Sequence, residues 1–500
     1  MKWRRLFSAL VLLWQFSFHT HVPASPPNII FFLVDDLGAT DLGSCGSTFY
    51  ETPNLDALAR QGIRFTEAYA ACPVCSPTRA SLFTGRWPQR TGVTDYLGAP
   101  PPEKWTRNTP LLPAPFVDRL SLDHVTIAEE LKAVGYQTFF AGKWHLGPEG
   151  WWPENQGFDV NRGGIDRGGP YGGNKYFSPY GNPRLEDGPP GEHLPKRLAM
   201  ETAAFIRQHR SSPFLAVLSF YSVHTPLMAR PDLLEKYRAK LRQTPIPDAW
   251  GHDGFRDVRL VQNHPVYAAM VEAMDQAVGT VLEALQDEGL EKNTMVIFSS
   301  DNGGLSTSEG WPTSNAPLRT GKGWLYEGGI RVPWIIRWPA VIPPASTCEI
   351  PVSSPDFFPT LAEAASLPAS VIASSDGQSM IPMFTGQPTA ERPLFWHYPH
   401  YGNQGGAPAS AIRSGKWKLI RWYEDQRCEL FDLDNDPSEQ TDVADKHPVR
   451  VSQMQERLAN WLVQVGARFP SANPAYDPAA ASGRTAVRSR SSTDPSHKDQ

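Results

Sequence analysis

The chain has 500 residues, of which 40% are hydrophobic and 20% are charged, and its formal net charge is -5. This is the composition of an ordinary globular protein, and the small negative charge gives no reason to expect nucleic acid as a partner. The length is sufficient for more than one hydrophobic core, so we expect two domains of unequal size. The 48 prolines and 40 glycines predict many irregular loops, where binding surfaces are commonly built.

The first residues have the pattern of a targeting segment. Lys2, Arg4 and Arg5 are followed by an apolar run at 6–18 and by small residues at 22–24. We therefore predict a secretory signal peptide over residues 1–24 and export to the periplasm, the extracellular space or a lysosome. No later stretch of 18 or more apolar residues follows, so we expect no membrane association after signal cleavage. The final compartment and the oligomeric state stay open.

Residues 28–34 form a continuous apolar run, which is typical of a strand buried on both faces of a sheet. The run ends at Asp35 and Asp36, and adjacent carboxylates are costly to bury unless a cation neutralises them. Oxygen ligands of this kind favour calcium or magnesium. Taken alone, the pair fits a solvated turn before Gly38 equally well.

The same pattern recurs three times along the chain. Predicted strands at 138–141, 214–220 and 295–300 are each followed by polar residues, namely Lys143 and His145, His224, and Asp301 and Asn302. Residues two apart in an extended backbone point the same way, so we expect Lys143 and His145 to face one pocket. The carboxyl ends of the strands line the ligand crevice of an open α/β sheet. These residues are therefore predicted to share a site.

Residues 75–79 read Cys-Ser-Pro-Thr-Arg and are followed by Ala-Ser-Leu-Phe-Thr-Gly-Arg. Pro77 suits the first turn of a helix, which places Cys75 at a helix amino terminus where backbone donors and the dipole favour an anion. Arg79, one turn later, is expected to face the same point. Taken alone, Cys75 also suits a small buried hydrophobe or half of a disulfide. The sequence does not pair the other four cysteines, Cys45, Cys72, Cys348 and Cys428.

A second characteristic run spans residues 319–333 and contains Lys322 among several glycines. Its spacing does not fit a nucleotide phosphate loop. Together with the Cys-x-Pro-x-Arg motif, the Gly142-Lys143-Trp144-His145 segment and the run at 429–439, it resembles the sulfatase family of the alkaline phosphatase superfamily. The resemblance extends over roughly residues 28–460.

This resemblance and the strand pattern predict an α/β fold with two parts. We expect a large catalytic domain over residues 28–390, with a mostly parallel central sheet flanked by helices. Short alternating runs after residue 391 predict a smaller C-terminal subdomain over 391–470, with an antiparallel sheet and a helix. Residues 473–500 are rich in Ser, Arg, Pro and Ala, and we expect them to be disordered.

The family resemblance implies a sulfuric ester hydrolase in which a maturation enzyme oxidises Cys75 to formylglycine. One hydroxyl of the hydrated aldehyde attacks sulfur, and the other then expels sulfate without attack by water. The implied cation is calcium rather than magnesium, held by Asp35, Asp36, Cys75, Asp301 and Asn302. Arg79 would hold the diol, and Lys143, His224 and Lys322 would bind the sulfate group. His145 would take the proton from the second hydroxyl, while His224 and Lys322 would protonate the leaving alcohol.

The sequence leaves several functional alternatives open. We expect a sulfated carbohydrate as substrate, with a phosphonate monoester or phosphodiester hydrolase of the same superfamily as the alternative reaction. A protein of another class, an inactive binder of sulfated glycans, is the third reading. Residues 147–195 form a long irregular segment whose Trp151, Trp152 and Tyr171 either stack on sugar rings or pin the loop to the surface. The sugar, the ring position and endo or exo action are not determined.

Overall fold

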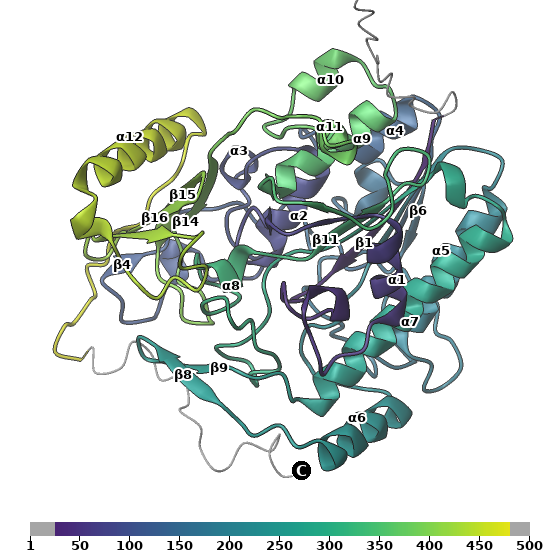
Figure 1. The fold of residues 1–500 in the computed structure, drawn as a ribbon, viewed down its shortest axis with the longest axis horizontal. Helices are drawn as coiled ribbons and strands as arrows, with labels where there is room; N and C mark the ends of the chain where they lie inside the picture. The colour runs from purple at the N-terminus through teal and green to yellow at the C-terminus, as the bar shows by residue number, and fades with distance from the viewer. Residues whose placement is uncertain (1–25, 481–500) are drawn as a thin grey trace, which may run out of the picture.

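The computed structural model describes residues 26–480, and its main feature is an eight-stranded sheet (Figure 1). The strand order is β12-β2-β11-β10-β1-β7-β5-β6. Its parallel centre is formed by β10 (Thr294–Ser300), β1 (Asn28–Val34), β7 (Phe214–Ser219) and β5 (Gln137–Gly142), with β6 (Val160–Arg162) continuing in the same direction at the edge. The predicted mostly parallel sheet is thus confirmed.

The other edge of the sheet contains short strands that the sequence analysis did not predict. β11 (Trp334–Arg337) runs antiparallel to β10 and to β2 (Ile63–Phe65), and β12 (Ser346–Cys348) runs parallel to β2. β3 (Ala68–Tyr69) pairs separately with β13 (Val352–Ser353). Residues 63–69 therefore form two short strands in different sheets.

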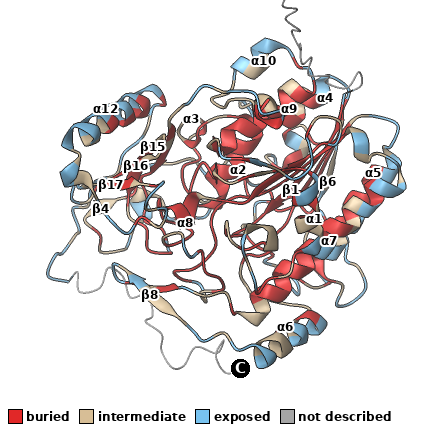
Figure 2. Cartoon of the chain, viewed as in Figure 1, coloured by how far each residue is buried: buried red, intermediate tan, exposed pale blue. Residues whose placement is uncertain are grey.

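Strand β1 is apolar throughout because helices cover both faces of the sheet. Ile30, Phe32 and Val34 lie in one hydrophobic core and Ile29, Phe31 and Leu33 in the other, all with 0% exposure. Full burial of such side chains is worth about 1.5–3 kcal/mol each. Figure 2 shows these two cores as the buried centre of the molecule. Packing on both faces therefore holds the central strand, and with it the start of the polar segment that follows, in a fixed position.

Two groups of helices cover the sheet. The first face is covered by α1 (Pro53–Gln61), α5 (Leu194–Gln208), α6 (Pro231–Gln243) and α7 (Pro265–Asp287), and the second by α2 (Cys75–Thr84), α4 (Ile127–Ala133), α9 (Phe357–Ala364) and α11 (Ile381–Phe384). A capping box is present at α4, where Thr126 Oγ1 accepts from the Glu129 amide and Glu129 Oε2 accepts from the Thr126 amide. The remaining helices of this domain are short: α3 (Pro88–Thr91), α8 (Glu327–Ile330) and α10 (Ala369–Ala373).

The C-terminal subdomain is a four-stranded antiparallel sheet with a helix on one face, as predicted. It comprises β14 (Leu394–Tyr398), β15 (Ala409–Ser414), β16 (Trp417–Trp422), β17 (Cys428–Asp432) and α12 (Pro448–Gln464). Its other face packs on Tyr69, Trp324 and Ile330 of the large domain. Because residues 324–330 follow Lys322 directly, this interface supports the segment that carries a predicted site residue.

The end of the described chain corrects one expectation. β18 (Ser471–Ala472) pairs with β4 (Leu111–Leu112), Asn473 Nδ2 donates to the Thr109 carbonyl at 2.8 Å, and the Asp477 amide donates to Asn108 Oδ1 at 2.9 Å. Residues 473–480 are therefore ordered, contrary to the predicted disorder from 473, because their polar groups find partners on the 108–112 segment. The predicted signal peptide at 1–24 and the tail at 481–500 lie outside the described residues.

The connections contain a few further short elements. A hairpin of β8 (Trp250–Asp253) and β9 (Arg256–Arg259) lies between α6 and the C-terminal subdomain in Figure 1. Single 3-10 turns occupy Gly43–Cys45, Pro102–Lys104, Pro153–Asn155, Glu291–Asn293, Ser354–Asp356 and Ala444–Lys446. Within residues 26–480, no helix is both long enough and apolar enough to cross a bilayer.

Candidate active site

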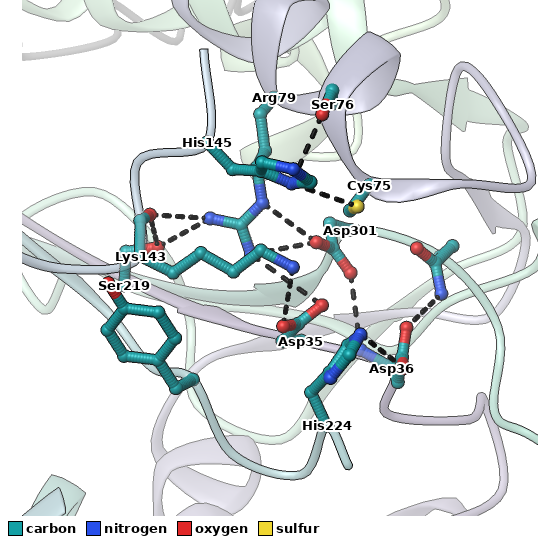
Figure 3. Close-up of polar contacts among 12 residues, drawn as sticks. Asp35, Asp36, Cys75, Ser76, Arg79, Lys143, His145, Ser219, His224 and Asp301 are labelled. Carbon is teal, nitrogen blue, oxygen red and sulfur yellow. Dashed lines mark hydrogen bonds and ion pairs between the residues drawn. The ribbon is translucent and has the colours of Figure 1, made fainter. Parts of the chain in front are cut away.

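Polar side chains from the ends of neighbouring parallel strands converge on one buried cluster (Figure 3). Asp35 and Asp36 follow β1, Asp301 and Asn302 follow β10, Lys143 follows β5, and His224 lies five residues after β7. Because β10, β1, β7 and β5 are adjacent in the sheet, their carboxyl ends bring these residues together. The structure thus gathers the strand-end residues that the sequence pattern singled out.

Cys75 is the first residue of α2 and faces the cluster. Its side chain is buried, and its Sγ lies 3.3 Å from Nδ1 of His145. The predicted helix start is correct, so the free backbone donors of the first turn lie beside residue 75. All five cysteines are free thiols, which leaves the disulfide interpretation of Cys75 without support.

His145 has a defined tautomer set by its surroundings. Its Nε2 lies 3.0 Å from the Leu97 carbonyl, which can only accept, so the ring proton is on Nε2. The Nδ1 lone pair therefore faces Cys75 and the Ser76 hydroxyl, which is 3.2 Å away. Burial and the nearby Lys143 charge lower the pKa of His145 well below its usual value. The residue can accept a proton from a group on position 75.

The backbone conformation that brings Lys143 and His145 to the cluster differs from the extended one that we expected. His145 has a φ of 57° and Asp36 a φ of 62°, both in the left-handed region that non-glycine residues seldom occupy. Lys143 and His145 do face the same cluster, but through a turn rather than an extended strand. Such backbone strain costs on the order of 1–3 kcal/mol and is typically found where side-chain placement matters for function.

Arg79 is fully buried and held by four contacts. Its Nε and Nη2 lie 2.8 and 2.7 Å from Asp301 Oδ2, and its Nη1 donates to the Lys143 carbonyl and to Ser219 Oγ, each at 2.7 Å. Burial opposes the charge, but Asp301 and Asp35 outweigh it and raise the pKa of Arg79. Ser219 was missed by sequence reasoning, although a serine that ends the apolar run of β7 was an available signal.

Two ion pairs join the lysines to the paired aspartates. Lys143 Nζ lies 2.6 Å from Asp35 Oδ2, and Lys322 Nζ lies 2.7 Å from Asp36 Oδ1. Burial raises the pKa of Asp35 well above its usual value despite Lys143. Burial also acts on Asp36, but nearby cationic side chains, first of all Lys322, bring its pKa below the usual range. The glycine-containing run at residues 319–333 thus places Lys322 in the same cluster as the residues at the strand ends.

The oxygen atoms of this cluster fit a hard divalent cation. Asp35 Oδ1 and Asn302 Oδ1 are buried and have no hydrogen-bond partner in the described part of the chain. Leaving such an atom unsatisfied costs about 1–3 kcal/mol, which a bound cation would offset. Asp35, Asp36 and His224 each present a ligand atom within 4.8 Å of the others. Asp301 turns Oδ1 toward the Asp36 amide at 3.2 Å and Oδ2 toward Arg79.

His224 and Lys322 both contact Asp36, and His224 lies across the aspartates from His145 in Figure 3. His224 Nδ1 lies 2.7 Å from the Thr225 carbonyl and so bears the ring proton, while Nε2 lies 3.8 Å from Asp36 Oδ2. Burial and the Lys322 charge lower the pKa of His224 to about 3. Burial opposes the charge of Lys322, but Asp36 and the other negative groups around it together raise its pKa. Lys322 is therefore charged and His224 neutral in this state.

The aromatic residues of the 147–195 segment divide into two kinds. Trp151 lies under the Arg119 guanidinium, and Trp152 is buried below Arg184, so both tryptophans pin the loop to the protein. Tyr171 is 48% exposed, and its ring centroid lies 6.4 Å from that of His224. Only Tyr171 of the three is placed beside the cluster.

Comparison with known proteins identifies the family. The family model described as Sulfatase matches residues 27–367, and the one described as N-sulphoglucosamine sulphohydrolase, C-terminal, matches residues 320–467. The chain belongs to the sulfatase family. It is therefore a hydrolase of the sulfuric ester type, as the sequence predicted.

Individual relatives agree with this assignment. This sulfatase is 34% identical to a sulfatase of Formosa agariphila, over 88% of its own chain and 89% of the relative. It is also 34% identical to human arylsulfatase A, over 79% of its chain and 75% of the relative.

Solved structures share the fold. The structure of Ps i-CgsB in complex with k-i-k-neocarrahexaose has a TM-score of 0.71 and 29% identity, covering 87% of this sulfatase and 93% of that chain. The phosphonate monoester hydrolase of Agrobacterium radiobacter has a TM-score of 0.61, with 88% and 96% covered, and its 21% identity indicates a shared fold alone.

Proposed function

We propose that this sulfatase hydrolyses a sulfate monoester of a carbohydrate, using formylglycine formed from Cys75 and a calcium ion. The observation that carries the proposal is the position of residue 75. It lies at a helix amino terminus, 3.3 Å from the unprotonated Nδ1 of His145 and beside a buried cluster of oxygen ligands and cationic side chains. An anionic ester would be attracted by the helix terminus and by the two lysines.

The cation would be held by Asp35, Asp36, Asp301, Asn302 and residue 75, and would supply positive charge next to the sulfate oxygens. Formylglycine would supply a nucleophilic hydroxyl and a second hydroxyl that lets sulfate leave. The oxygen donors that lack partners, Asp35 Oδ1 and Asn302 Oδ1, support calcium or magnesium over softer metals, and the family resemblance favours calcium.

The roles of the other residues follow from their positions. Arg79 is locked by Asp301 and stabilises negative charge that develops at residue 75. Lys143 and Lys322 bind sulfate oxygens, whose charge grows as the ester bond breaks. His145 accepts a proton through Nδ1 from the hydroxyl that expels sulfate. Lys322 is charged and delivers the proton to the leaving alcohol, and His224 contacts the same aspartate, Asp36.

A carbohydrate substrate is supported by two observations. The solved structure of Ps i-CgsB contains a neocarrahexaose, and this sulfatase is 29% identical to it over most of the chain. Tyr171 offers an exposed ring at the edge of the cluster, on which a sugar ring can stack. We further propose export through the secretory route, on the basis of the pattern at residues 1–24.

The test has a chemical and a kinetic part. Peptide mass spectrometry of protein from a host that makes formylglycine should show the aldehyde at position 75, whereas an intact thiol would favour a binding protein without turnover. Steady-state kinetics should show higher kcat/KM on an aryl sulfate than on an aryl phosphate diester or phosphonate monoester. A preference for the phosphorus esters would replace the sulfatase reaction by the alternative one.

A further inference from the structure

Two arginines beside the active-site cluster have no acidic partner. Arg256, the first residue of β9, is 2% exposed. Its Nη2 donates to the Asn403 carbonyl at 2.8 Å, but Nε and Nη1 are buried with no hydrogen-bond partner among residues 26–480. Leaving guanidinium donors unsatisfied in the interior is costly. The protein thus maintains a buried positive charge that its described residues do not neutralise.

Arg107 lies near Arg256 and adds a second positive charge that is partly open to solvent. Its guanidinium carbon lies 5.1 Å from the ring centroid of Trp105 and 5.6 Å from that of Tyr401, and Nη1 donates to the Tyr401 carbonyl at 3.3 Å. No carboxylate of the described chain lies within ion-pair distance of either arginine. Burial, followed by repulsion from Arg107, lowers the pKa of Arg256 to about 10.

The carboxylates near this arginine pair are already engaged. Asp95 Oδ1 accepts from the Tyr398 hydroxyl at 2.9 Å and from the Tyr96 amide at 2.9 Å, and burial raises the pKa of Asp95 to about 7. Glu309 accepts from Gln404 Nε2 at 2.6 Å. Asp95 acts on Arg107 only at longer range, and neither Asp95 nor Glu309 forms an ion pair with Arg107 or Arg256 in the described chain, which leaves both arginines available to an anion from outside.

The arginine pair is linked to the catalytic cluster on two sides. Asn403, which accepts from Arg256, donates through Nδ2 to the Tyr96 hydroxyl at 3.0 Å. Tyr96 precedes Leu97, whose carbonyl contacts His145. On the other side, Gln404 packs so closely on Gly323, the neighbour of Lys322, that a Cβ there would lie 2.7 Å from Gln404 Oε1. The pair therefore flanks the cluster rather than lying elsewhere on the surface.

We propose that Arg107 and Arg256 form a second anion-binding subsite, which takes a sulfate or carboxylate group on the sugar ring next to the ester that is cleaved. Arg107 contacts this group directly through its free donors, and the buried charge of Arg256 strengthens the field behind it. The inference rests on the proposed function and narrows its substrate to saccharides that have a second anionic group.

The kinetic test compares matched saccharides. Three disaccharides share one sulfate ester and differ on the neighbouring ring, which has a second sulfate, a uronate carboxylate or no charge. We expect Arg107→Gln to lower kcat/KM for the preferred doubly anionic disaccharide by about tenfold or more, mainly through KM. Its kcat/KM for the uncharged neighbour and for an aryl sulfate should change by less than about threefold. Equal losses on all substrates would overturn the subsite.

The control is Arg210→Gln, which removes the same charge from a side chain that is 62% exposed. Arg210 precedes β7, at the edge of the sheet opposite the active site. Its substrate preference should match that of the wild type. A similar loss for doubly anionic substrates in this variant would show that overall charge, and not a subsite, sets the preference.

Binding separates this inference from the proposed function. Calorimetry with the Cys75→Ala protein measures the affinity for the same disaccharides without turnover, and Arg107→Gln in that background should abolish the preference for the second anion. If the wild type cleaves no sulfate ester but this preference is present, the proposed reaction fails and the subsite stands. If affinity is equal for all three disaccharides, the subsite is refuted whatever the enzyme cleaves.

Arg256→Gln distinguishes an anion site from a structural arginine. Removing a buried unpaired charge should leave the thermal midpoint unchanged or raise it, and should reduce the affinity for the doubly anionic disaccharide by severalfold. A structural role would give the reverse, namely a lower midpoint with an unchanged preference among the disaccharides. That result would remove Arg256 from the subsite.

Discussion

Replacing Lys418 by methionine tests how the C-terminal subdomain supports the active site. Lys418 Nζ lies 2.9 Å from Glu327 Oε1 and 2.8 Å from Glu439 Oε1, and all three side chains are 0% exposed. Glu327 also accepts from the Tyr69 hydroxyl at 2.8 Å and follows the segment that carries Lys322. This buried group therefore joins β16 to the large domain at the point where a predicted site residue is positioned.

The expected loss follows from burial. Removing one partner from a buried ion pair costs about 3–5 kcal/mol, because the remaining charge is left in the interior. With an unfolding entropy of about 2.1 cal/mol/K per residue, this corresponds to a decrease in Tm of roughly 3–5 °C for a chain of this length. Thermal unfolding followed by circular dichroism measures the shift.

The dependence on pH gives an independent check on the cause. Burial already raises the pKa of Glu439 to about 7, and loss of Lys418 would raise it further. A carboxyl group whose pKa is higher in the folded state than in the unfolded state binds more protons in the folded protein. Its contribution to the free energy of unfolding is therefore lost as the pH rises. The decrease in Tm should accordingly be larger at pH 8 than at pH 5.

Lys416→Met is the matched control, two residues away in sequence. Lys416 pairs with Asp432 at 2.7 Å but is 38% exposed, so its loss should cost less than about 1 kcal/mol. If Lys418→Met lowers Tm no more than this control, the buried group does not stabilise the domain interface and the reasoning fails.

Three further predictions concern the site and acid stability. Cys75→Ala should abolish sulfate ester turnover with an unchanged circular dichroism spectrum, and residual activity above about a thousandth of wild type would contradict a covalent role. Removal of calcium by a chelator should lower both activity and Tm, since an ion at 100 times its Kd stabilises the fold by about 2.7 kcal/mol; full activity in protein shown by elemental analysis to be free of metal would contradict the cation site. His397 is buried, and burial lowers its pKa from 6.5 to about 4. The unfolded chain then binds the proton first, so this histidine should cost stability as pH falls from 6.5 to 4, up to about 3 kcal/mol. His397→Asn should flatten this part of the acid unfolding curve, and an unchanged curve would refute the assignment.

The sequence alone determined the core of the fold. Apolar runs such as residues 28–34 predict strands buried on both faces, since no polar alternation is present, and the polar residues directly after them predict a shared edge of the sheet. The Cys-x-Pro-x-Arg motif predicted the start of α2, because proline in the first turn and the residues that follow suit a helix. These signals depend only on residues that are close together in the sequence, so they can be interpreted without the tertiary structure.

Tertiary structure alone decided the partners of each side chain. Whether Trp151 stacks on sugar or pins a loop depends on Arg119, which lies 32 positions earlier in the chain. β11 escaped prediction because its pairing with β10 and β2 is long-range, and residues 473–480 are ordered only because the 108–112 segment lies beside them. The uncompensated charge of Arg256 is likewise invisible in a sequence, because a missing partner is a property of three-dimensional surroundings. Secondary structure depends largely on residues that are neighbours in the sequence. The pairing, burial and protonation of the site residues depend on segments that meet only in the folded chain.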